Sequence, residues 1–230
     1  NLTGLDRIVA HRRLILPQLG AVGVSARDVK KACGFKVTWG PIRVEDIKDF
    51  VTSGMKADAS MRRVTFTMAE RLVLTPVEVT MIYKPTLWVL LAIFVLSGIG
   101  PDIFSFSDSW FRGLAAFMAY GAAILAGAVA SPALLPWIPG KAFSIKGAIL
   151  GLIAGLAVIG ISSDISGSAD ALGIVFFTMA VSSYLAMNFT GATPYTSPSG
   201  VEKEMRKAIP LQAAAVLSAA VLWVVSGFIA

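Results

Sequence analysis

Few side chains in this sequence could carry the chemistry of an enzyme active site. The 230 residues include one histidine, His11, and one cysteine, Cys33. The two could form a nucleophile and its base, but a zinc or iron–sulfur site made of protein ligands needs more of these residues. The sequence contains no GxxxxGK(S/T), GxGxxG, HExxH or CxxC motif. These observations exclude the common nucleotide-binding and zinc-hydrolase classes.

Cys33 and His11 also have plainer interpretations. Cys33 falls late in an amphipathic helical pattern, between Ala32 and Gly34, and we expect a buried structural thiol there. His11 precedes Arg12 and belongs either to a ligand-binding loop or to the ordinary surface. With one cysteine no intrachain disulfide can form, which is compatible with a reducing compartment.

The elements that would position these residues lie within residues 5–52. We expect a strand at Arg7–Ala10, an apolar run at Leu14–Pro17, a helix from Ser25 to Cys33, a strand at Lys36–Trp39 and a helix at Val44–Val51. This alternation favours parallel pairing in a partial α/β, Rossmann-like segment. Two or three strands do not form a stable doubly wound domain alone. We therefore expect residues 1–60 to be the C-terminal part of a larger α/β domain.

Ligands of parallel α/β sheets bind beyond the carboxyl ends of the strands. The residues at those positions are the predicted cofactor-binding residues. They are His11, Arg12, Gln18, Gly20, Trp39, Gly40 and Pro41.

A long polar loop at residues 188–204 is the second candidate site. Glycine and proline fix its backbone, and it is rich in hydroxyl groups. It is either a substrate-binding or docking loop or an ordered turn that caps the following helix. The side chains expected to act there are Asn188, Thr190, Thr193, Thr196 and Ser197.

The rest of the chain has the composition of a membrane protein, since 56% of all residues are hydrophobic and 15% are charged. Five apolar stretches approach the length that a bilayer requires. They predict an all-α bundle at residues 85–230 with spans near 87–104, 112–135, 145–162, 170–189 and 209–229. Residues 61–84 are expected to connect the two parts at the membrane surface. Arg62–Phe66 and Arg71–Leu74 would be strands or an extended connector, and Thr75–Pro76 would open a helix.

The charges of the sequence predict an orientation in the membrane. Residues 1–84 contain 14 of the 20 Lys and Arg residues and 8 of the 14 Asp and Glu residues, so they hold the net charge of +6. The loops after the second and fourth spans are also basic. By the positive-inside rule the N-terminal segment is cytoplasmic and the C-terminus lies outside, in the cytoplasmic (inner) membrane. In the third span, Gly147, Gly151 and Gly155 predict close helix packing, with a pore lining as the alternative.

Three stretches, residues 12–21, 37–46 and 188–204, together with the five-span tail, resemble the C-terminal part of the HgcA family. These are the corrinoid proteins of microbial mercury methylation. The resemblance implies a corrinoid (cobalamin-type) cofactor and transfer of a methyl group from cobalt to the substrate Hg(II), giving methylmercury. It also implies a ferredoxin-like partner, HgcB, and contact with membrane lipid but not with nucleic acid. The corrinoid domain of this family is similar to that of the corrinoid iron–sulfur protein of the acetyl-CoA pathway.

The sequence departs from that family at the lower cobalt ligand. In the family this ligand is the Cys of a cap-helix motif, Asn-(Val/Ile)-Trp-Cys-Ala-(Ala/Gly)-Gly-Lys, and residues 1–230 do not contain it. Cys33 stands in Lys31–Phe35, which does not match, so the ligand role is not assigned to it. We therefore expect this chain alone to be inactive. The alternative hypothesis is a non-catalytic membrane anchor or passive carrier with a basic cytoplasmic docking segment.

Overall fold

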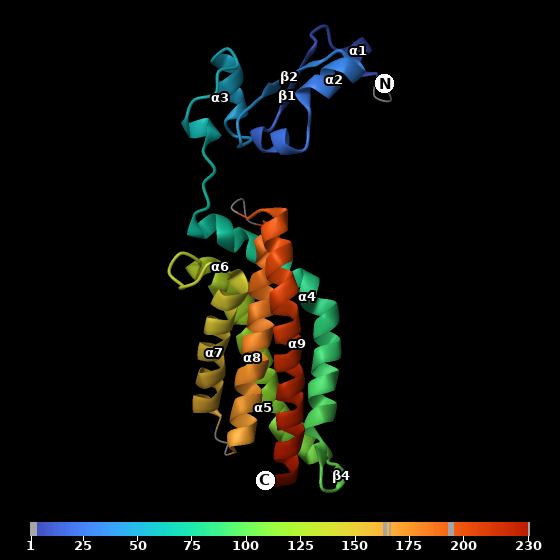
Figure 1. Cartoon of the computed structure of the whole chain (residues 1–230), viewed down its shortest axis with the longest axis vertical. Coiled ribbons are helices and arrows are strands. Elements are labelled where there is room, and N and C mark those ends of the chain that lie inside the picture. Colours follow the sequence, from blue (N-terminus) through green and yellow to red (C-terminus); the bar gives the residue numbers. More distant parts are fainter. Residues whose placement is uncertain (1–3, 163–164, 166, 193–195, 230) are drawn as a thin grey trace. The chain divides into compact units, whose positions relative to one another are not determined.

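The chain divides into two structural units, Asn1–Thr65 and Phe66–Ala230. The computed structural model describes residues 4–162, 165, 167–192 and 196–229 (Figure 1). The first unit combines a small sheet with short helices, and the second consists of long helices and one short hairpin.

The first unit is built around two parallel strands. Strand β1 (Arg13–Leu16) pairs in parallel with β2 (Lys36–Trp39) over the whole length of both. The 3-10 turn η1 (Gln18–Val22) and helix α2 (Ala26–Cys33) connect them. The predicted parallel pairing is confirmed for these two strands.

Residues 7–10 do not form the predicted strand. Helix α1 (Leu5–Ile8) takes the first of these positions instead. A strand requires a neighbour that pairs with its N–H and C=O groups, and residues 13–16 occupy the place beside β2. Within the described residues the sheet of this unit has two strands, so the Rossmann-like part of the predicted fold is not established.

Helix α2 begins and ends where the sequence predicts. Ser25 Oγ accepts a hydrogen bond from the Asp28 N–H at 3.3 Å, which satisfies a donor of the first helical turn. Gly34 ends the helix with a φ of 75°, a conformation that glycine adopts without strain. Cys33 is exposed, and its Sγ donates to the Val29 carbonyl at 3.0 Å. The expected burial of this thiol is wrong, because α2 buries none of its residues.

Helix α3 (Ile47–Thr52) closes the first unit at the carboxyl ends of the strands. Its Phe50 is completely buried, and Val37 of β2 is buried as well. A Cβ atom at Gly40 would lie 2.8 Å from Ile15 Cγ2 and 3.8 Å from Phe50 Cε1. Glycine at position 40 therefore lets the segment after β2 lie close to Ile15 of β1. The 3-10 turn η2 (Ser60–Arg62) follows.

The second unit contains, within the described residues, five helices that are long and apolar enough to cross a membrane, as predicted. They are α4 (Met68–Ser97), α5 (Phe106–Ile124) with its continuation through the π-helical η3 (Leu125–Ala130) and α6 (Ser131–Leu134), α7 (Phe143–Ile161), α8 (Ser168–Asn188) and α9 (Pro198–Ile229). Strands β3 (Ile99–Gly100) and β4 (Ile103–Phe104) form an antiparallel hairpin after α4, and η4 (Phe189–Ala192) follows α8.

Helix α4 begins earlier than the sequence predicts. Thr67 and Glu70 form a reciprocal capping box, in which Glu70 Oε2 accepts from the Thr67 N–H at 2.7 Å and Thr67 Oγ1 accepts from the Glu70 N–H at 3.4 Å. This cap starts the helix at Met68. Residues 71–74 are therefore helical rather than extended, and the helix start expected at Thr75–Pro76 is wrong.

Helix α4 also ends earlier than the predicted span 87–104. It stops at Ser97, and the hairpin of β3 and β4 follows. Pro76 and Pro85 lie inside the helix, where each removes a backbone donor and bends the axis. Figure 1 shows the first turns of α4 running across one end of the bundle before the helix turns along its side.

Helix α8 packs closely against α7. A Cβ at Gly147 or Gly151 of α7 would lie 2.5 Å from the carbonyl oxygen of Ser182 or Thr178 of α8, so α7 and α8 approach closely. Gly155 is buried in the same contact, which confirms the predicted packing ridge.

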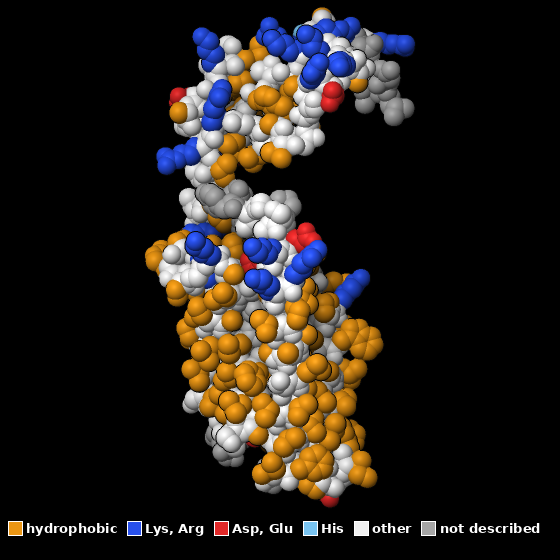
Figure 2. Space-filling model, viewed as in Figure 1, with side chains coloured by type: hydrophobic (Ala, Val, Ile, Leu, Met, Phe, Trp, Pro, Cys, Tyr) orange, Lys and Arg blue, Asp and Glu red, His pale blue; other side chains and the backbone are white. Residues whose placement is uncertain are grey.

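The outer surface of the bundle is apolar along the helices. Figure 2 shows hydrophobic side chains over most of their length, with Lys and Arg gathered where α9 begins. Leu87, Leu156 and Leu217 are among the exposed large apolar residues. Such a surface is unfavourable in water and favourable in a lipid bilayer.

Candidate functional site

The carboxyl ends of β1 and β2 bring five of the seven predicted cofactor-binding residues to one edge of the first unit. The Gly40 N–H donates to the Leu16 carbonyl at 2.9 Å, which holds the segment after β2 beside the segment after β1. Gln18, Gly20 and Trp39 are half-buried at this edge. Gly40 and Pro41 are buried within the unit.

His11 and Arg12 lie at the opposite edge of the sheet. Both precede β1, and the Arg12 carbonyl accepts a hydrogen bond from the Lys36 N–H, at the start of β2, at 2.8 Å. The Arg12 guanidinium lies over the Phe35 ring, 5.3 Å from its centroid. These two residues were assigned to a carboxyl end because Arg7–Ala10 was expected to be a strand. The structure therefore separates them from Gln18 and Trp39.

The two side chains best suited to ligate the cobalt of a corrinoid do not lie at the carboxyl edge of the sheet. The side chains best able to ligate cobalt, Cys33 and His11, both stand next to the amino ends of the strands, and the Cys33 thiol bonds to its own helix. At the carboxyl edge, Gly40 and Pro41 are buried, and Phe50 of α3 lies next to Gly40. Among the described residues no group of three or more His, Cys, Asp or Glu is placed to hold a metal ion.

Several side chains of the loop after α8 form hydrogen bonds within the same segment. Thr190 is 2% exposed, and its Oγ1 donates to the Met187 carbonyl at 2.6 Å. Thr196 Oγ1 donates to the Thr190 carbonyl at 2.6 Å. Ser197 Oγ accepts from the Gly200 N–H at 3.2 Å, as an N-terminal cap of α9 does. Among the described residues, Thr190 and Thr196 thus bond to backbone carbonyls of the same segment, and Ser197 caps the last helix.

Two of the predicted loop residues remain. Asn188 is exposed at the end of α8. Thr193 lies outside the described residues. Phe189 is buried, and its ring stacks on Phe66 with centroids 6.2 Å apart. The start of the loop is thus fixed to the segment that precedes α4.

A buried polar cluster at one end of the bundle escaped the sequence reasoning. Arg112 of α5 donates through Nη2 to Ser226 Oγ at 2.7 Å, to Asp170 Oδ1 at 3.5 Å and to the Trp223 carbonyl. Its guanidinium lies 5.0 Å from the centroid of the Trp223 ring. Trp223 Nε1 donates to Ser97 Oγ at 2.9 Å. This cluster, the Arg112 cluster, joins α4, α5, α8 and α9.

The opposite end of the bundle buries a different arginine. Arg71 of α4 is 5% exposed, and its Nη1 donates to the Pro132 carbonyl at 2.9 Å and to the Ala133 carbonyl at 3.1 Å. Lys146 Nζ donates to the Leu135 carbonyl at 2.5 Å. The two cations bind the carboxyl-terminal carbonyls of the helix that ends with α6, where the helix dipole is negative. We call this end of the bundle, where Lys141, Lys203 and Lys207 are exposed, the basic end.

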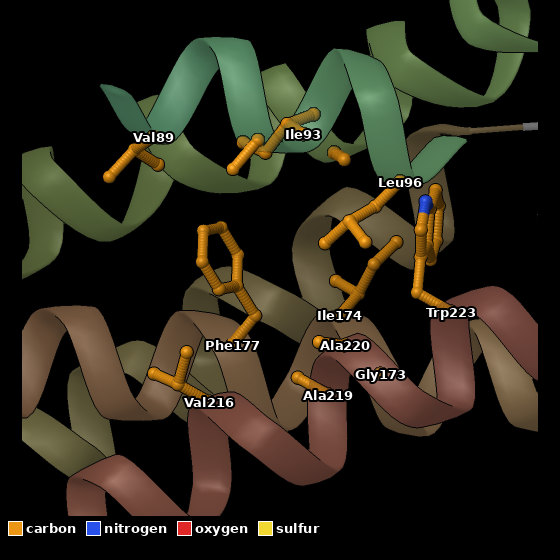
Figure 3. Close-up of a pocket in the computed structure, with 12 residues that line it drawn as sticks. Val89, Ile93, Leu96, Gly173, Ile174, Phe177, Val216, Ala219, Ala220 and Trp223 are labelled. Carbon is orange, nitrogen blue, oxygen red and sulfur yellow. The ribbon is translucent and has the colours of Figure 1, made fainter. Parts of the chain in front are cut away.

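An apolar cavity of about 170 Å³ lies between α4, α5, α8 and α9. Figure 3 shows Val89, Ile93 and Leu96 of α4 facing Phe177 of α8 and Val216 of α9 across it. Its lining is almost free of polar atoms, so it offers nothing that would distinguish one apolar guest from another.

A second hollow, which we call the Gln212 groove, has a volume of about 210 Å³ and lies between α7, α8 and α9. Its walls include Ile145, Met179 and Leu211, and its polar side chains are those of Ser144, Ser183 and Gln212. Gln212 Nε2 donates to Ser183 Oγ at 2.8 Å. The sequence offered one signal for this site, a glutamine inside an otherwise apolar span.

Comparisons with models of protein families, with curated protein sequences and with solved structures found no match for this chain.

Proposed function

We propose that this chain is the membrane part of a corrinoid-dependent methyltransferase that passes a methyl group from cobalt to Hg(II). The proposal rests on the resemblance of residues 12–21, 37–46 and 188–204 to that family. The observation that supports it best is the parallel pairing of β1 and β2, in which Leu16 is the partner of Trp39, in a unit that five membrane-length helices follow in the chain.

The cobalt ligand, on this proposal, comes from residues other than those of this chain. The cap-helix motif is absent from its sequence, and Cys33 and His11 stand at the wrong edge of the sheet. Residues Gln18 and Trp39 would then border the cofactor without ligating cobalt. The bundle anchors the protein, and HgcB or a similar ferredoxin would return the cobalt to its reduced state.

The proposed orientation puts the basic end of the bundle in the cytoplasm. Lys141, Lys203 and Lys207 stand at this end together with the start of α4, through which the first unit is attached. Positive charge next to membrane spans favours the cytoplasmic side. The exposed Asn188 and the loop after it then face the compartment in which Hg(II) and the ferredoxin are met.

Expression of the natural gene that encodes this chain tests the proposal. An anaerobic host that does not methylate mercury would receive the gene together with a ferredoxin-like partner. The expected result is methylmercury formed from added Hg(II), with a corrinoid absorption spectrum in the purified membrane protein. A gene product that reaches the membrane but shows neither the spectrum nor methylmercury would overturn the proposal.

A second function has its own support. The Arg112 cluster ties α4, α5, α8 and α9 together within the helical unit. A bundle joined in this way suits a non-catalytic membrane anchor. In the experiment above, an anchor would give a membrane-bound protein and no methylmercury.

A further inference from the structure

We propose that the Gln212 groove binds a membrane lipid that carries a hydroxyl group. The inference is independent of methyl transfer and requires only that α7, α8 and α9 lie in a bilayer. It starts from one buried atom. Gln212 is 9% exposed, and its Oε1 is buried with no hydrogen-bond partner among the described residues.

A buried carbonyl oxygen without a donor is costly, and most such atoms in proteins have a partner. The amide nitrogen of the same side chain already donates a hydrogen bond to Ser183 Oγ, so Oε1 is the atom of this amide that lacks a partner. Both side chains line the groove. The site is therefore a mainly apolar hollow in which Gln212 Oε1 lacks a donor, with the Ser183 hydroxyl beside it and Ser144 as a second serine in the lining.

A hydroxyl group is the ligand chemistry that fits these two side chains. It donates its proton to Gln212 Oε1, and its oxygen accepts from the Ser183 hydroxyl. A hydrocarbon chain alone would leave Oε1 unpaired, and a carboxylate would place a negative charge next to a carbonyl oxygen inside the membrane.

The walls of the groove suit the chain of a lipid. Ile145 and Leu211 are exposed on the outer face of the bundle, so the groove opens toward the surrounding bilayer. Residues 208–215 of α9 run about 12 Å along it, at 1.5 Å for each residue. Gln212 lies five residues after Lys207, about 7.5 Å below the basic end by the same rise. A lipid hydroxyl just beneath the headgroup level, as in a diacylglycerol or a long-chain alcohol, would reach it.

Photolabelling of the full chain in lipid nanodiscs tests the proposal. The probe is hexadecanol with a photoactivatable diazirine on its chain, and the comparison probe is its methyl ether, which cannot donate a hydrogen bond. Labelled positions are read by mass spectrometry. The alcohol should label the segments at Ile145–Ala148, Met179–Ser183 and Ala208–Ala215 about five to ten times more than the ether, the factor given by one hydrogen bond.

Two variants separate recognition of the hydroxyl group from general packing. Gln212→Leu removes the acceptor and should bring the alcohol-to-ether ratio close to one. Leu211→Ala shortens an apolar wall and should lower labelling by both probes while the ratio is kept. Equal labelling by the two probes in the native chain, or no labelling of the groove by the alcohol, would overturn the proposal.

Discussion

Each end of the helical bundle holds an arginine, Arg112 partly buried and Arg71 buried, and the two charges are compensated in different ways. Arg112 binds the carboxylate of Asp170 together with Ser226 Oγ and the Trp223 carbonyl. Arg71 donates to backbone carbonyls at the end of a helix. Removing one partner of the first arrangement leaves a buried charge without compensation. Removing Arg71 leaves only helix-end carbonyls, which are partial charges.

The largest effect is expected when the ion pair is broken from one side. Arg112→Met leaves the Asp170 carboxylate, whose side chain is 12% exposed, next to Ser226 alone. The free energy of unfolding in detergent should fall by about 2–4 kcal/mol, somewhat less than for a completely buried pair. The double variant with Asp170→Leu should recover most of that loss. Losses that simply add would show that the two side chains do not act together.

The next largest loss of stability is expected from the close contact between α7 and α8. Gly151→Ala puts a Cβ 2.5 Å from the Thr178 carbonyl oxygen, so α7 has to move away from α8. We expect a loss of about 1–3 kcal/mol in the same measurement. Gly160→Ala is the matched control on α7, since a Cβ there meets nothing within 4 Å, and it should leave stability unchanged or slightly raised. Equal losses in both variants would contradict the packing assigned to this ridge.

Arg71 gives a smaller effect than Arg112. Arg71→Met removes two hydrogen bonds to the Pro132 and Ala133 carbonyls, and Lys146 still binds the neighbouring Leu135 carbonyl. The free energy of unfolding should fall by about 1–2 kcal/mol. The conservative variant Arg71→Lys should retain part of this stabilisation. A loss as large as that of Arg112→Met would contradict the claim that the charges of the two arginines are compensated in different ways.

The sequence predicted the features that depend on neighbouring residues. Ser25 and Gly34 bound α2, and the Gly147 ridge packs a helix, because caps and small-residue spacing act within one segment. The five long apolar helices were predicted for the same reason. The start of α4 was missed because Thr67 and Glu70, which form its cap, lay in a segment with strand-like apolar spacing.

Contacts between distant residues could not be predicted from the sequence. Arg112 and Asp170 stood at the edges of two predicted spans, and only the packing of α5 against α8 makes them partners. His11 was placed at the wrong edge because one short apolar run, 7–10, was assigned as a strand. Cys33 was expected to be buried, but the helix that carries it has no buried residue among the described residues of its unit.

The smallest effect concerns the loop after α8. Ser197→Ala removes the acceptor for the Gly200 N–H and should cost about 0.5–1 kcal/mol, as for other helix caps. Asn188→Ala changes an exposed side chain and should leave stability unaltered. If Asn188→Ala also leaves methylmercury formation unaltered in the gene-expression experiment, Asn188 has no role in docking or substrate binding.

The orientation of the basic end is the central claim, and the chain carries its own reporter for it. Cys33 is the one cysteine in the sequence, and it is exposed. A membrane-impermeant maleimide should label it in inside-out membrane vesicles and not in intact cells. In a Cys33→Ser background, Asp102→Cys reports the hairpin at the opposite end and should show the reverse pattern. Labelling of Cys33 from outside intact cells would contradict the proposed orientation.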